Sequence, residues 1–138
     1  MKDIYTLYLA ISAWIGLGVI VYVAFVRMQL VERDTKFPQE EGVEPEANYH
    51  GRGGWNGARA VRNPFARLSL YGDFFVAGFK TQRIVLPYSA ITKLEPHERS
   101  GKTWLLINAT DPETDKNYEM YFLNPEIDAI QKSIESKR

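Results

Sequence analysis

The sequence contains no cysteine, and this absence removes several chemistries at once. It excludes disulfide frameworks, thiolate nucleophiles and thiolate metal sites, although it fits any redox compartment. Histidine is nearly absent too, because His50 and His97 are the 2 such residues and neither has the spacing of a metal ligand pair. We therefore expect no metal site and no cofactor.

The sequence also has no excess of basic or of acidic residues. With 17 basic and 17 acidic residues the formal net charge is zero, so the whole chain gives no argument for nucleic-acid binding. The carboxylates gather in residues 40–46, 111–115 and 126–128, where solvated turns and helix caps explain them. No pattern places two of them in a pocket, so we expect no catalytic residue, no small-molecule substrate and no enzyme.

Nucleotide-binding loops are missing as well. The glycine-rich stretch HGRGGWNG, residues 50–57, has Asn56 where a dinucleotide fingerprint needs glycine. A Walker A loop ending in Gly101-Lys102-Thr103 would need its first glycine where Pro96 stands. Both nucleotide-loop interpretations are therefore excluded.

What the sequence does have is one long apolar run, residues 4–26, without a charged side chain. As a helix this run is roughly 34 Å long at about 1.5 Å per residue, enough to cross a hydrocarbon core of about 30 Å. A cleaved signal peptide is the alternative. Against it stand the length of the run, its weakly basic start and the lack of a small-x-small site after Val26. We expect a single retained transmembrane helix.

Basic residues beside the span predict its orientation. Lys2 lies on the N-terminal side, whereas Arg27, Arg33 and Lys36 lie on the C-terminal side. Because cytoplasmic flanks are richer in Lys and Arg, we expect the N-terminus outside and the C-terminal domain in the cytoplasm, as in a bacterial inner membrane.

Ser12 and Gly16 form a small-xxx-small pair within the span. Such a pair lets another helix approach closely, so other transmembrane subunits are candidate partners. The alternative is that these small residues have no such role, since small residues are common in spans.

The chain divides into three predicted regions: a transmembrane helix at 1–28, an extended acidic and glycine-rich linker at 29–56, and a β domain with a C-terminal helix at 57–138. The linker carries four glutamates between and around two prolines, namely Glu40, Glu41, Glu44, Glu46, Pro38 and Pro45. Such a composition buries too little apolar area to fold alone, so it should be extended or follow a partner's surface.

The β domain shows short apolar runs separated by turn residues, which is typical of an antiparallel sheet. The predicted strands are 67–71, 74–79, 82–88, 90–95, 103–109 and 117–123, with an earlier strand near 57–62. After them Asn124 predicts an N-cap and Pro125 a first helical position. One face of this helix carries Ile127, Ile130 and Ile134. We expect the three isoleucines to be buried over an opening of the sheet, with Lys132 and Glu135 exposed.

The segments ARLSLYGDFFVAGF, RIVLPYSAITKLE, KTWLLINA and YEMYFLNPEIDAIQKSI resemble, in this order, the pleckstrin-homology-like superfold, including its bacterial and GRAM-type members. The resemblance covers roughly residues 57–137. It implies a bent, nearly orthogonal barrel or sandwich of about six or seven antiparallel strands capped by the C-terminal α-helix. It further implies binding of proteins, peptides or lipid headgroups rather than catalysis.

Cations are concentrated in residues 50–93, where seven Lys and Arg stand against Asp73 alone. Arg59, Arg62 and Arg67 flank residues 63–66 and are the candidates for contact with an acidic partner or with anionic headgroups. We expect a non-enzymatic single-pass accessory or scaffold subunit of a larger membrane complex, with protein contacts on its PH-like domain. The alternative is a membrane-tethered module that binds anionic lipid headgroups.

Overall fold

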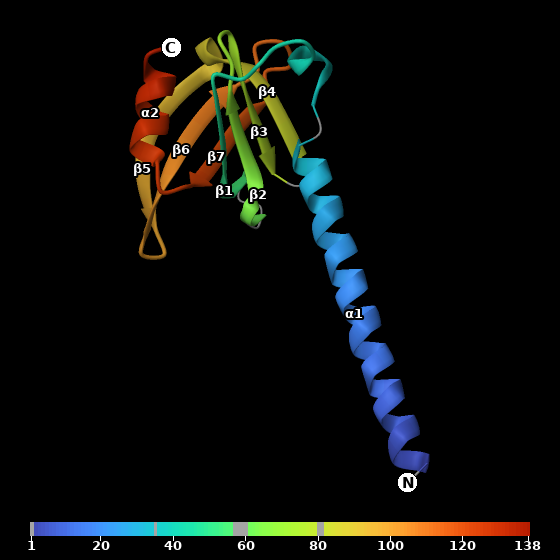
Figure 1. Cartoon of the computed structure of the whole chain (residues 1–138). Coiled ribbons are helices and arrows are strands. Elements are labelled where there is room, and N and C mark those ends of the chain that lie inside the picture. Colours follow the sequence, from blue (N-terminus) through green and yellow to red (C-terminus); the bar gives the residue numbers. More distant parts are fainter. Residues whose placement is uncertain (1, 35, 57–60, 80–81) are drawn as a thin grey trace. The chain divides into compact units, whose positions relative to one another are not determined.

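The computed structural model describes residues 2–34, 36–56, 61–79 and 82–138 (Figure 1). The chain forms two compact units, divided between Glu32 and Arg33. The first consists of most of helix α1 (Lys2–Asp34), and the second contains a β-sheet and helix α2 (Ile127–Glu135). The predicted fold class is thereby confirmed, with an apolar N-terminal helix, a sheet of antiparallel strands and a C-terminal helix.

Helix α1 is long and apolar enough to cross a membrane. Its large apolar side chains between Ile4 and Phe25 are 46% to 74% exposed, so the described part of the chain does not cover them. The helix continues to Asp34, beyond the predicted end at residue 28. The added turns contain good helix formers and neither Gly nor Pro, so no local signal ends the helix earlier.

Seven strands lie within the described residues: β1 (Ala47–Trp55), β2 (Val61–Leu70), β3 (Phe74–Phe79), β4 (Gln82–Pro87), β5 (Ile91–Arg99), β6 (Lys102–Thr110) and β7 (Asn117–Leu123). They form one open sheet in the order β4-β3-β2-β1-β7-β6-β5, and the pairings are antiparallel. Figure 1 shows that the sheet curves, with β1 between the two groups of strands. The predicted β3 and β7 have the observed bounds, and β2, β5 and β6 are longer than predicted.

Strand β1 is the main departure from the sequence prediction, which placed a first strand near residues 57–62 and a linker at 29–56. The observed strand lies inside that linker, and residues 57–60 lie outside the described residues. Its first half pairs with β2 and its second half with β7. A Cβ at Gly51 would collide with the carbonyl oxygen of Leu123, and one at Gly53 would lie 2.8 Å from Cε1 of Phe79. The glycines therefore permit a close approach of β7 and are not linker residues.

The core lies between the curved sheet and α2. Its fully buried members come from both groups of strands and include Leu68, Phe75, Leu105 and Phe122, each at most 1% exposed. Along β6, Leu105, Ile107 and Ala109 belong to this core, which follows the alternation of a strand with one buried face.

Helix α2 lies beside β5 and β6 (Figure 1). Ile130 and Ile134 are completely buried, whereas Ile127 is half-buried. Lys132 and Glu135 are exposed, as predicted. The regular helix begins two residues later than an Asn124 N-cap would place it. The Asn124 side chain still accepts a hydrogen bond from the N–H of Glu126 at 2.7 Å, as an N-cap side chain does, in the turn that leads into the helix.

We predict that Ile130→Ala destabilises the unit formed by residues 33–138 by about 2–5 kcal/mol, since it leaves a cavity under α2. Glu135→Ala on the exposed face of the same helix should change stability by no more than about 0.5 kcal/mol. Denaturant unfolding of the two variants measures both values. Equal, small effects would show that α2 does not contribute to the core.

Candidate functional site

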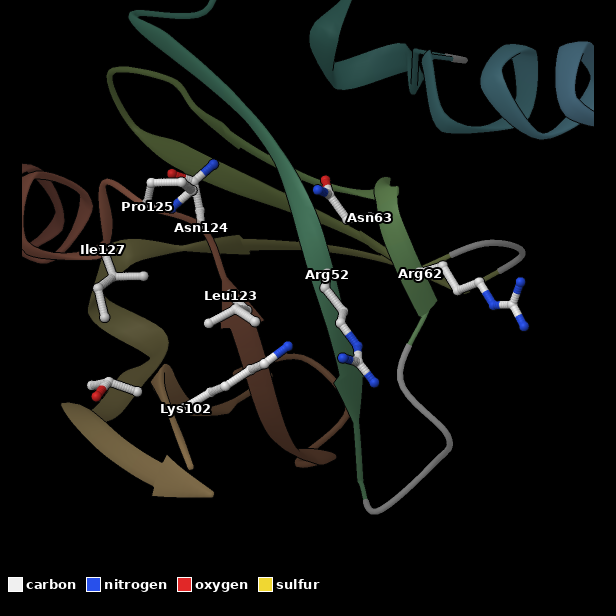
Figure 2. Close-up of a pocket in the computed structure, with 9 residues that line it drawn as sticks. Arg52, Arg62, Asn63, Lys102, Leu123, Asn124, Pro125 and Ile127 are labelled. Atoms are coloured by element: carbon white, nitrogen blue, oxygen red, sulfur yellow. The ribbon is translucent and has the colours of Figure 1, made fainter. Parts of the chain in front are cut away.

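A cationic groove of about 800 Å³ is the best candidate for a functional site (Figure 2). It lies where β1, the start of β2, the start of β6 and the end of β7 meet the turn before α2. The groove is lined by Arg52, Arg62, Asn63, Lys102, Thr103, Leu123, Asn124, Pro125 and Ile127. We call this site the cationic groove.

Long-range strand pairing brings these residues together. Arg52 in β1 stands opposite Leu123 in β7, so both belong to the same face of the sheet. Lys102 follows the β5–β6 turn, in which Ser100 and Gly101 both have positive φ. The Asn124 side chain donates to the carbonyl oxygen of His50 at 2.8 Å and thereby ties the turn before α2 to β1.

The side chains differ in how far they enter the groove. In Figure 2 the Lys102 side chain extends past Leu123 toward Arg52, whereas the Arg62 guanidinium points away from the other labelled residues. Arg52 is further oriented by the ring of Trp104, whose centroid lies 5.5 Å from the guanidinium carbon. A guanidinium that stacks on a ring can still donate hydrogen bonds to a ligand, because its N–H groups lie in the guanidinium plane and point away from the ring.

The lining contains three cations and no carboxylate. Hydrogen-bonding groups of Asn63 and Thr103 stand among them, whereas the Asn124 side chain is already bonded to the backbone of His50 and Glu126. Arg and Lys next to neutral donors bind carboxylates and phosphates through charge-assisted hydrogen bonds. The chemistry that this groove supports is therefore anion binding.

The three arginines selected from the sequence have different surroundings. Arg62 lines the groove and is exposed. Arg59 lies outside the described residues. Arg67 is not a surface residue, which corrects the prediction that it contacts headgroups or a partner: its side chain is 4% exposed and forms an ion pair with Glu40 at 2.9 Å.

The partner of Arg67 lies in the segment predicted to be an extended linker. Glu40 is 0% exposed and ends a short 3₁₀ helix, Pro38–Glu40. Its carboxylate accepts hydrogen bonds from the Arg67 guanidinium, from the Tyr71 hydroxyl at 2.7 Å and from the Phe37 N–H at 2.7 Å. We call this the Glu40 cluster. It makes the acidic segment part of the folded unit.

Opposing effects act on the pKa of Glu40. Burial alone raises it, but the hydrogen bonds from Arg67, Tyr71 and Phe37 together outweigh burial and lower it below its ordinary value of 4.5. In the same cluster, burial and the bond to Glu40 raise the pKa of Tyr71 to about 12. Because the folded-state pKa of Glu40 is depressed, its contribution to stability is complete above about pH 4.5 and is lost as the pH falls through the folded-state value.

The residues proposed for helix packing, Ser12 and Gly16, lie on α1, and both are exposed. A Cβ added at Gly16 would meet no atom within 4 Å. A larger side chain at Gly16 therefore clashes with no described residue of this chain.

Sequence reasoning missed Arg52 and Lys102. Arg52 was assigned to a linker, and Lys102 entered only through an excluded Walker A motif. Neither residue has an apolar neighbour in the sequence, since Arg52 lies between Gly51 and Gly53 and Lys102 between Gly101 and Thr103. Only the pairing of β1 with β7 and of β7 with β6 shows that they share a face.

Comparisons with protein-family models and with curated proteins find no match to this chain.

We predict that Glu40→Gln destabilises the unit of residues 33–138 by about 3 kcal/mol near neutral pH, because it leaves the buried Arg67 charge without its carboxylate. Glu41→Gln is the matched control, since Glu41 is exposed, and should cost at most about 0.5 kcal/mol. The difference between Glu40→Gln and the unchanged protein should shrink well below about pH 4.5, where Glu40 is protonated. Urea unfolding at several pH values tests this, and a pH-independent difference would contradict it.

Proposed function

We propose that this chain is a non-enzymatic, single-pass accessory or scaffold subunit of a larger membrane complex. The observation that supports this most is the uncovered surface of α1, whose apolar side chains remain largely exposed over the whole candidate span. Such a surface is compatible with lipid and with neighbouring helices. In this proposal α1 spans the bilayer and packs on other subunits, while the sheet unit makes the protein contacts.

A PH-like assignment of the sheet unit is part of the proposal. The strand order β4-β3-β2-β1-β7-β6-β5 is compatible with a bent sheet made of two groups of strands. A C-terminal helix beside β5 and β6 is also compatible with the PH-like arrangement. The PH-like superfold serves many binding functions, so the partner must be inferred from surface chemistry rather than from the fold.

We place the sheet unit in the cytoplasm, with the N-terminus of α1 on the other side of the membrane. The support is the set of cations that follow the apolar run, Arg27, Arg33 and Lys36, compared with Lys2 before it. On the cytoplasmic side the unit can reach the soluble faces of partner subunits.

Extraction of the full chain in mild detergent tests the role of the span. The unchanged protein should co-purify with other membrane subunits, and Gly16→Leu should weaken that association about tenfold, because Leu separates two closely packed helices. Gly18→Leu is the matched control. Its Cβ likewise meets no atom within 4 Å, and positions two apart face different sides of a helix. A lone monomer under every mild extraction would refute the accessory-subunit proposal, and equal losses for the two variants would refute packing through Gly16.

The second candidate function is binding of anionic lipid headgroups, which the three cations of the groove favour. Each cation near an anionic leaflet contributes about 1 kcal/mol, and salt screens this attraction. Liposome flotation of residues 33–138 separates this candidate from the first. Binding that requires anionic lipid, weakens steeply with salt and falls in Arg62→Gln is the expected result for a headgroup site. No binding at low salt rejects it.

A further inference from the structure

The sheet has a second face on β1, β7, β6 and β5 that is turned away from the core. Cross-strand pairs lie on one face of a sheet, and three pairs define this surface: Arg52 with Leu123, His97 with Trp104, and Arg99 with Lys102. Tyr121 and Leu106 form the adjacent pair. We call these eight residues the outer face: Arg52, His97, Arg99, Lys102, Trp104, Leu106, Tyr121 and Leu123.

Cations and aromatic rings are interleaved on the outer face. The Arg52 guanidinium lies over Trp104, and the Arg99 guanidinium lies over Tyr121 at 5.6 Å from the ring centroid. The His97 ring is 5.6 Å from the Tyr121 ring. Trp104 is only 7% exposed although it does not belong to the core cluster, so the long side chains around it provide its cover.

Arg, Trp and Tyr are the residues most enriched at the energetic centres of protein interfaces. Stacking restricts the two guanidinium groups before any partner arrives, which reduces the entropy that binding would cost. Arg52 and Lys102 also line the cationic groove, so the outer face and the groove form one continuous surface.

The charges along this surface are graded rather than uniform. Arg52, Arg99 and Lys102 occupy one end, whereas Glu119 accepts a hydrogen bond from the Tyr121 hydroxyl toward the other. Glu95 stands opposite Leu106 in the same part of the sheet and is paired with Lys93 at 3.2 Å. An anionic bilayer would repel the exposed Glu119 carboxylate at separations below the Debye length of about 8–10 Å. A polypeptide, in contrast, can present carboxylates to one end and hydrogen-bond donors to the other.

The acidic segment of this chain is partly engaged elsewhere. Glu40 is buried against Arg67, and Glu46 forms an ion pair with Lys137. A second molecule is therefore the better source of carboxylates for the groove.

We propose that the outer face and the cationic groove form the docking surface for an extended acidic segment of a partner protein, whose carboxylates bind between Arg52 and Lys102. This inference rests on the proposed accessory function, because it assigns the surface through which the sheet unit contacts its complex. The half-buried Tyr121 ring packs against the apolar side chains of the same segment.

The full chain in nanodiscs of zwitterionic lipid, titrated with a fluorescently labelled pentaglutamate peptide, tests this proposal by fluorescence anisotropy. Pentaglutamate should bind and pentaserine should not. Arg52→Gln and Lys102→Gln should each lower the affinity about tenfold, because each removes charge-assisted hydrogen bonds to carboxylates. Lys132→Gln, the same charge change on the exposed face of α2, should lower it less than about twofold.

Three outcomes overturn the proposal. One is absence of pentaglutamate binding at low salt, and another is an equal loss in Lys132→Gln and Lys102→Gln, which would indicate nonspecific attraction. The third is binding of phosphatidylglycerol vesicles, sensitive to Lys102→Gln, without binding of the peptide, which assigns the surface to lipid. The peptide titrations test binding by the sheet unit, whereas the detergent extraction tests association through the transmembrane helix. Failure of the accessory function is therefore distinguishable from failure of this inference.

Discussion

A fully buried carboxylate is costly unless its charge is paired and its oxygens accept hydrogen bonds, and the folded unit satisfies this condition at Glu40. Arg67 from β2, Tyr71 after β2 and the backbone of Phe37 all donate to it. Because these donors are spaced along the chain, the segment that follows α1 can adopt its conformation only when β2 is in place. The same segment then leads into β1, which joins the two groups of strands. The sheet and the acidic segment are therefore one cooperative structure.

The parts of the fold that were predictable are those determined by neighbouring residues. Alternation and turn residues located β3 and β7, and the spacing of Ile130 and Ile134 identified the face of α2 that is buried. The position of β1 depends instead on the path of β7, because the close approach of β7 requires glycine at two positions of β1. These glycines give β1 the composition of a linker. Similarly, the Phe37 N–H is a local partner of Glu40, but the burial of Glu40 depends on an arginine 27 residues away.

Some residues of the candidate site could likewise be predicted from the sequence, and others could not. Counting cations identified Arg62, because the basic region of the sequence is evident without a structure. The count also selected Arg67. Alternation along β2 puts Arg67 on the face opposite the core residues Ala66 and Leu68, and it is buried there because it pairs with the distant Glu40. Arg52 and Lys102 join Arg62 only through pairing of strands that are far apart in the sequence. A groove assembled from four elements has no contiguous motif, and this explains why the residue types were visible but their combination was not.

The close approach of β7 to Gly51 and Gly53 also limits how this sequence can diverge. Neither position tolerates a side chain without displacing backbone or the Phe79 ring. Homologues that keep the close approach of β1 and β7 should therefore keep both glycines, while the surrounding surface residues vary. Distant homologues of this fold should therefore carry a recognisable sequence signature. It consists of the two glycines of β1, a buried glutamate before them and a buried arginine after them.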